Sequence, residues 1–150
     1  DLRRPPARNN KKSGRTMQKL YLLDTNIIIH LLHGKFGVKE SIIAAGISNC
    51  YISDISLAEL YFGAYNSENP VSALESIDLL ANVFHRLPVS QSVVQRFGQE
   101  KAILRRNGLI IDDFDILIGT TAIVNNMIVV TENTKHLERL PVTVENWVKR

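Results

Sequence analysis

Four acidic residues stand where the sequence changes from one predicted element to the next. Asp24 follows the apolar run "KLYLL", Glu59 lies in "SLAEL", and Asp112 and Asp115 lie in "IDDFDILIGTT". Each has a purely structural explanation, because Asp is a preferred helix N-cap and both Ser56 to Glu59 and Asp112 to Asp115 have capping-box spacing. Gathered in one partly buried site, the same carboxylates would repel one another unless a cation offset their charge.

The chemistry that such a cluster would support is metal-dependent. Hard carboxylate oxygens suit Mg²⁺ or Mn²⁺, and the absence of Cys or His beside them argues against zinc. One or two such ions can activate water and stabilise charge on a phosphodiester during in-line attack. The acids therefore predict nuclease chemistry. The sequence has no G-x-G-x-x-G and no P-loop, so neither a dinucleotide nor a nucleoside triphosphate fold is indicated.

The elements that must position these acids alternate between short apolar runs and longer helical patterns. The predicted strands are residues 19–24, 49–54, 87–90, 126–133 and 142–147. The predicted helices are residues 25–35, stopped by Gly34, then 38–46, 56–67, 70–87, 91–108 and one from the acidic stretch to about 125.

This alternation predicts an α/β fold, a three-layer α/β/α sandwich whose central sheet is mostly parallel. Ligands of such open sheets bind beyond the carboxyl ends of the strands, where the helices begin. All four acids lie at helix starts, so we expect them to share one edge of the sheet.

Composition favours one globular domain over residues 17–150. Apolar residues make up 45% of the 150 residues and charged residues 22%, which is close to globular averages. The single cysteine, Cys50, excludes an internal disulfide and fits a reducing compartment, so we expect a cytoplasmic protein. No apolar run is long enough to suggest a membrane span.

The net charge of +3 is concentrated at the beginning of the chain. Residues 1–16 hold six basic side chains and one acidic one, which leaves 12 of the 18 basic and 14 of the 15 acidic residues to residues 17–150. We interpret residues 1–16 as a disordered basic leader or a non-native remnant, with Met17 as the natural start. A basic arm that binds nucleic acid is the functional alternative.

Four motifs in order resemble the PIN-domain ribonucleases, specifically the VapC-type toxins of bacterial toxin–antitoxin pairs. They are "YLLDTNIII", "ISLAELYFGA", "DFDILIGTTAIVNNMIVVTENTKHLERL" and "VENW", and the resemblance covers residues 19–147. It implies a PIN-like fold and a Mg²⁺-dependent endoribonuclease, with Mn²⁺ as a possible substitute. It also implies a structured RNA substrate, a cognate antitoxin that inhibits the enzyme, and a homodimer.

The resemblance also implies the site. Asp24, Glu59 and Asp115 would be catalytic, with Asp24 and Asp115 as metal ligands. Five residues would support them: Thr25, Asn26, Asp112, Thr131 and Asn133. No residue is assigned to substrate binding, although His136 follows the last long strand closely enough to be a candidate.

Asn133 departs from the fullest family pattern, which has a fourth acid there. A neutral amide offers an oxygen without charge, so one Mg²⁺ with a water network would suffice. Glu132 could compensate only if the strand turned it inward. The same departure motivates an alternative function, a noncatalytic binding module. Five apolar residues could line an antitoxin groove, although we expect most of them to be core residues: Ile28, Leu31, Leu60, Tyr61 and Phe62.

Overall fold

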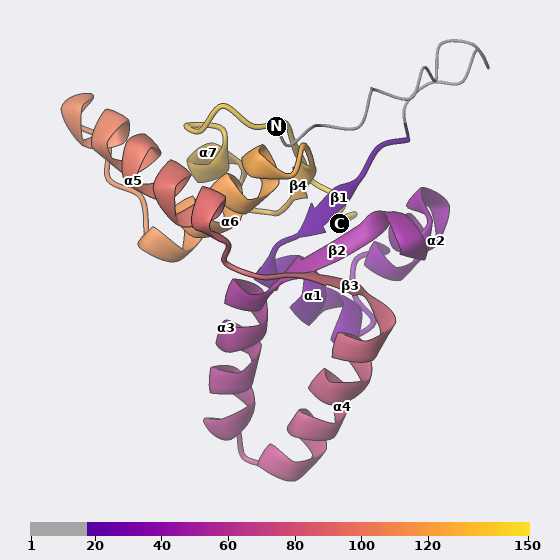
Figure 1. The fold of residues 1–150 in the computed structure, drawn as a ribbon. Helices are drawn as coiled ribbons and strands as arrows, with labels where there is room; N and C mark the ends of the chain where they lie inside the picture. The colour runs from indigo at the N-terminus through magenta and orange to yellow at the C-terminus, as the bar shows by residue number, and fades with distance from the viewer. Residues whose placement is uncertain (1–17) are drawn as a thin grey trace, which may run out of the picture.

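Five short strands form one sheet in the order β3-β2-β1-β4-β5, and every neighbouring pair within residues 18–150, the part that the structure describes, is parallel (Figure 1). The structure is a computed structural model, and the predicted leader and Met17 lie outside its described residues. The strands are β1 Tyr21–Leu23, β2 Cys50–Ser53, β3 His85–Leu87, β4 Ile128–Val130 and β5 Val144–Glu145.

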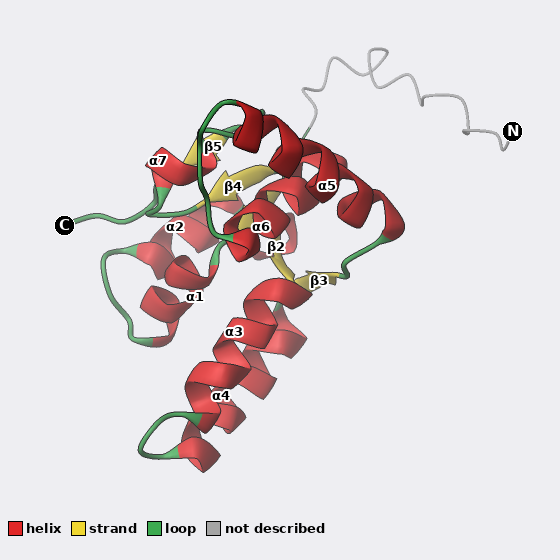
Figure 2. Cartoon of the chain, turned by 90° about the vertical axis from the view of Figure 1, so that its left-hand side faces the viewer, coloured by secondary structure: helices red, strands yellow, loops and turns green. Residues whose placement is uncertain are grey.

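Helices cover both faces of this sheet, which confirms the predicted α/β/α sandwich. They are α1 Thr25–Leu32, α2 Val38–Ala45, α3 Asp54–Tyr65, α4 Pro70–Val83, α5 Gln91–Arg106, α6 Asp113–Val124 and α7 Thr134–Leu137, with a short 3₁₀ turn at Ile47–Asn49. In Figure 2, α3 and α4 lie side by side as a hairpin that extends away from the sheet.

The strands divide the interior into two cores because successive side chains point to opposite faces. In β1, Leu23 packs against the side formed by α1 to α4, whereas Leu22 packs against the side formed by α5 to α7. In β4, Val130 and Val129 divide in the same way. The strands therefore read as continuous apolar runs, as expected of a parallel sheet buried on both faces.

Two predicted elements were misplaced. The third strand is His85–Leu87 instead of residues 87–90, and α4 ends at Val83 instead of residue 87. A strand that begins with His and Arg lacks the apolar signature, because it lies at the edge of the sheet with only β2 beside it. The one-turn helix α7 was not predicted, since four residues are too few for a periodic pattern.

None of the helices in residues 18–150 is both long enough and apolar enough to cross a membrane.

Candidate active site

The carboxyl ends of β2, β1 and β4 lie side by side at one edge of the sheet, because these three strands are neighbours and parallel. Asp24 follows β1 directly, α3 with Glu59 follows β2, and Thr131 follows β4. This is the edge at which the sequence predicts a site, and strand order rather than sequence distance brings the residues there.

Asp24 is the most enclosed of the acids, with 4% of its surface exposed. It caps α1, and its Oδ1 accepts a hydrogen bond of 2.7 Å from the Thr25 backbone N–H. Its Oδ2 accepts from the Thr131 hydroxyl at 2.7 Å and from the Asn26 amide at 3.4 Å. These donors hold the carboxylate in one orientation, and Asn26 also donates to Thr131 Oγ1 at 3.2 Å.

Glu59 lies on α3 and faces the start of α1. The Thr25 hydroxyl donates to its Oε1 at 2.6 Å. The predicted capping box from Ser56 to Glu59 is wrong, because α3 begins two residues earlier and its N-cap is Ser53, whose hydroxyl accepts from the Ser56 N–H. With no helix end to cap, Glu59 is free to face the neighbouring acids.

Asp115 lies in the first turn of α6 and faces the end of β4. The Asn133 amide donates to its Oδ2 at 3.0 Å, and His136 Nδ1 lies 3.8 Å from the same oxygen. Among the described residues, His136 Nδ1 is a buried atom without a hydrogen-bond partner. The ring of His136, which the sequence offered as a candidate for substrate binding, therefore lies beside Asp115.

The other two acids of "IDDFD" have structural roles. Asp112 caps α6 by accepting from the Phe114 N–H at 2.9 Å, which confirms it as the helix cap. The Asp113 side chain is 53% exposed and pairs with Lys101 at 2.8 Å. Of the three acids in that stretch, Asp115 is the one that faces Asn133.

Burial raises the pKa of all three inward acids, and neighbouring negative charges add to the shift at Glu59 and Asp115. Burial raises the pKa of Asp24, while its hydrogen bonds from Thr131, Thr25 and Asn26 oppose this shift. Burial also raises the pKa of Glu59, against the Thr25 hydrogen bond and with the charges of Asp24 and Asp112.

Asp115 is shifted furthest. Burial, followed by the negative charges of Asp24 and Asp112, raises its pKa to about 6, and Glu59 adds to the same effect. His136 acts in the opposite direction. Carboxylates from three separate elements therefore share one local excess of negative charge.

This donor set fits a hard divalent cation. Excess negative charge among oxygen donors is what such an ion offsets, and one buried atom beside Asp115, His136 Nδ1, has no hydrogen-bond partner among the described residues. In residues 18–150 no three His, Cys, Asp or Glu side chains are grouped closely enough to bind a metal directly. Mg²⁺ needs fewer protein ligands, because it keeps several waters and is bound by one or two carboxylates.

Glu132 does not supply the missing fourth acid. Its carboxylate faces away from Asp115 and accepts hydrogen bonds from His30 and Arg150. The sequence identified neither partner, because His30 lies 102 residues from Glu132 and no local pattern connects them.

The shift of Asp115 makes the stability of the metal-free protein depend on pH. A carboxyl whose pKa is raised by folding contributes stability below its unfolded value near 3.8, and that contribution is lost as the pH rises through about 6. We expect the free energy of unfolding to fall between pH 4 and 6, by at most about 3 kcal/mol for this group and by less after solvent screening.

Urea unfolding in EDTA at several pH values would measure this effect. Asp115→Asn should flatten the decline, whereas Asp113→Asn should leave it unchanged. Equal slopes for the wild type and Asp115→Asn would contradict the expectation.

Comparison with known proteins agrees with this geometry. The model of the PIN domain family matches residues 21–142. Ribonuclease VapC2 of Rickettsia felis is 31% identical over 87% of this chain and 99% of its own length. The tRNA(fMet)-specific endonuclease VapC of Shigella flexneri is 30% identical over 85% of this chain and 97% of its own length.

Solved structures give the same result. The crystal structure of VapBC2 from Rickettsia felis bound to a DNA fragment from their promoter contains a chain that superposes with a TM-score of 0.80. That match has 29% sequence identity and covers 85% of this chain and 98% of the other. Sequence, fold and the order of the acids thus agree, and this chain belongs to the PIN-domain family, in its VapC branch.

Proposed function

We propose that the protein is a Mg²⁺-dependent endoribonuclease toxin that cleaves structured RNA and is inhibited by a cognate antitoxin. The observation that carries the proposal is the meeting of Asp24, Glu59 and Asp115, from three elements, in one cluster, where the charge of Asp24 raises the pKa of both Glu59 and Asp115. The names of the relatives, ribonuclease and tRNA-specific endonuclease, support the same reaction and substrate class. Mn²⁺ would serve as an alternative ion.

Asp24 and Asp115 would hold the ion, which when bound supplies an activated water and neutralises charge on the phosphodiester. The residues of this chain orient the carboxylates. Thr131 and Asn26 hold Asp24, and the Asn133 amide holds Asp115.

Glu59 is placed to receive a proton from the attacking water. Its Oε1 is engaged by Thr25, while among the described residues its Oε2 has no hydrogen-bond donor. Burial and the charges of Asp24 and Asp112 raise the pKa of Glu59, which brings it closer to the operating pH of a general base.

Cleavage of a labelled transfer RNA with Mg²⁺, with Mn²⁺ and with EDTA tests this proposal. We expect cleavage with either ion and none in EDTA, restored by adding Mg²⁺ back. Cleavage that survives chelation would contradict the metal dependence. RNA binding without cleavage would instead favour the noncatalytic binding module, for which the amide of Asn133 in place of a fourth acid is the motivation.

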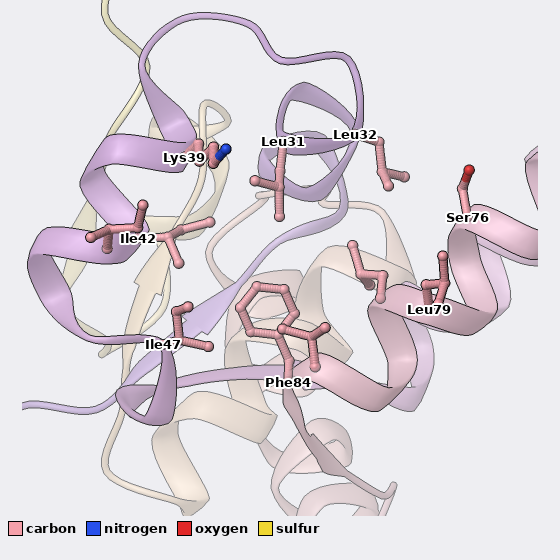
Figure 3. A pocket seen from close by; sticks show the side chains of 11 residues that line it. Leu31, Leu32, Lys39, Ile42, Ile47, Ser76, Leu79 and Phe84 are labelled. Atoms are coloured by element: carbon pink, nitrogen blue, oxygen red, sulfur yellow. The ribbon is translucent and has the colours of Figure 1, made fainter.

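An apolar groove between α1, α2 and α4 offers a binding site for the antitoxin. It encloses about 390 Å³ and is lined mainly by Leu, Ile, Val and Phe side chains (Figure 3). Several of these are exposed large hydrophobics, including Ile43, Leu79 and Val83. The superposed Rickettsia felis chain comes from a VapBC2 structure, which supports a protein partner for this one.

Of the five residues named as possible groove lining, Leu31 lines this groove. Ile28 and Leu60 are buried in the core, as expected for most of the five, and the Tyr61 hydroxyl donates to Asp78. The homodimer stays part of the proposal.

Leu79→Asp tests the groove. Leu79 is 71% exposed, so the change should leave folding and RNA cleavage intact. We expect it to weaken antitoxin binding by about 2 kcal/mol or more, roughly 30-fold, because it places a charge in an apolar contact. Val71→Asp is the control, since Val71 is 69% exposed on the same helix and lies outside the groove. Equal titration curves for the two variants would count against this binding site.

A further inference from the structure

Glu132 lies between the two residues that orient the acids. Thr131 on one side donates to Asp24, and Asn133 on the other donates to Asp115. Its own carboxylate leaves the site and is bound by two donors, His30 Nε2 at Oε1 and the Arg150 guanidinium at Oε2, the latter at 2.6 Å. The Glu132 side chain therefore contacts neither Asp24 nor Asp115, but it is held at the middle of the turn whose flanking residues hydrogen-bond to both.

We propose that Glu132 is a positioning residue for the acid cluster, acting through the turn 131–133 and fixed by His30 and Arg150. The inference rests on the proposed ribonuclease function, because it names a residue that sets the geometry of that same site. It assigns Glu132 no contact with substrate or metal.

Helix α1 holds residue 132 at two points. The Glu132 backbone N–H donates to Asn26 Oδ1 at 3.1 Å, and His30 binds the carboxylate. Asn26 and His30 are four residues apart, so they lie on one face of the helix. Because Asn26 also contacts Asp24 and Thr131, a shift of residue 132 would be transmitted to the buried acid.

Residues 149 and 150 hold His30 and Glu132 in place through contacts with Phe36. The Arg150 guanidinium lies over the Phe36 ring, 4.3 Å from its centroid, and that ring meets His30 edge to face at 4.7 Å. The Lys149 N–H donates to the Phe36 carbonyl at 2.8 Å. Phe36 has a φ of 61°, an uncommon conformation for an aromatic residue, which the surrounding contacts must maintain.

Small displacements at this turn should matter for rate more than for folding. A misplacement of about 1 Å can cost roughly 100-fold in catalysis, because reacting groups need a narrow range of geometry. Glu132 is at the surface end of the network, with its side chain 26% exposed, so its loss should not unfold the domain. The charge of Arg150 also neutralises the carboxylate, which keeps it from adding to the negative charge of the cluster.

The test compares Glu132→Gln and Arg150→Gln with two matched controls. Glu138→Gln removes an exposed acid a few residues further along, and Lys149→Gln removes a cation whose hydrogen bond to Phe36 uses only its backbone. We expect the two test variants to lose about tenfold in kcat for RNA cleavage with KM within twofold of the wild type. The controls should match the wild type, and Arg150→Lys should recover part of the loss.

Two further readouts separate positioning from other roles. Mg²⁺ affinity by calorimetry should fall less in Glu132→Gln than in Asp115→Asn, and the side-chain amide resonances of Asn26 and Asn133 should shift in ¹⁵N spectra. A loss of Mg²⁺ affinity as large as that of Asp115→Asn would identify Glu132 as a ligand and overturn the proposal. Unchanged kcat with lowered thermal stability would also overturn it, since that result describes a purely structural contact.

The failure of the proposed function is distinguishable from the failure of this inference. Absence of cleavage by the wild-type protein would refute the ribonuclease. The amide resonances would still decide the positioning role, because unshifted Asn26 and Asn133 signals in Glu132→Gln overturn it with or without activity.

Discussion

Asp115→Asn is expected to reduce RNA cleavage by about 100-fold or more, whereas Asp113→Asn should cleave at close to the wild-type rate. The two residues lie in the same helical turn, but Asp115 meets Asn133 and His136, while Asp113 pairs with Lys101 at the surface. Losing even an outer contact of a metal centre commonly costs 10–100-fold, so a direct ligand should cost at least as much.

Asp24→Asn is expected to show a loss of similar size. Asp24 is buried and accepts three hydrogen bonds, so this substitution also tests the fold. Circular dichroism and thermal unfolding would verify that each variant is folded before its rate is compared under single-turnover conditions. Activity of folded Asp24→Asn or Asp115→Asn close to wild type would remove the acid cluster from the mechanism.

Gly119→Ala is expected to destabilise the protein by about 1–3 kcal/mol, the cost of overpacking a core. Alanine is normally better than glycine inside a helix by about 1 kcal/mol, so the sign is reversed here. A Cβ at Gly119 would overlap Leu140 Cδ1 and lie 3.3 Å from Leu137 Cδ1. Both leucines are buried, at 3% and 0% exposure, and have little room to withdraw.

Gly98→Ala and Gly63→Ala are the matched controls. Both glycines lie in helices, and a Cβ at either position meets nothing within 4 Å. They should be neutral or stabilise the protein by up to about 1 kcal/mol. Urea unfolding of the three variants measures the difference. A stability of Gly119→Ala equal to that of Gly98→Ala would show that α6 can move away from α7 and its following loop.

Close packing therefore explains the glycine at position 119, because a Cβ there would meet Leu140 and Leu137. Helix propensity alone argues against glycine inside α6, where alanine is normally better. Leu137 and Leu140 explain the choice, because they close the core on that side of α6.

Local chemistry in the sequence was sufficient for the alternation of strands and helices and for two of the helix caps. Asp24 and Asp112 cap the helices that they precede, as their residue type predicts. Local chemistry did not predict β3 correctly, because this edge strand begins with polar residues. It also placed the start of α3 wrongly, since the cap is Ser53 and not Ser56.

The partners of the acids were decided by tertiary structure alone. Thr25 and Glu59 are 34 residues apart, Asp115 and Asn133 are 18 apart, and His30 and Glu132 are 102 apart. Spacing within a helix or strand cannot choose among such partners, because local rules reach only a few residues along the chain. The strand order β2-β1-β4 brings these partners together. That order follows from the burial of apolar residues of distant segments on both faces of one sheet.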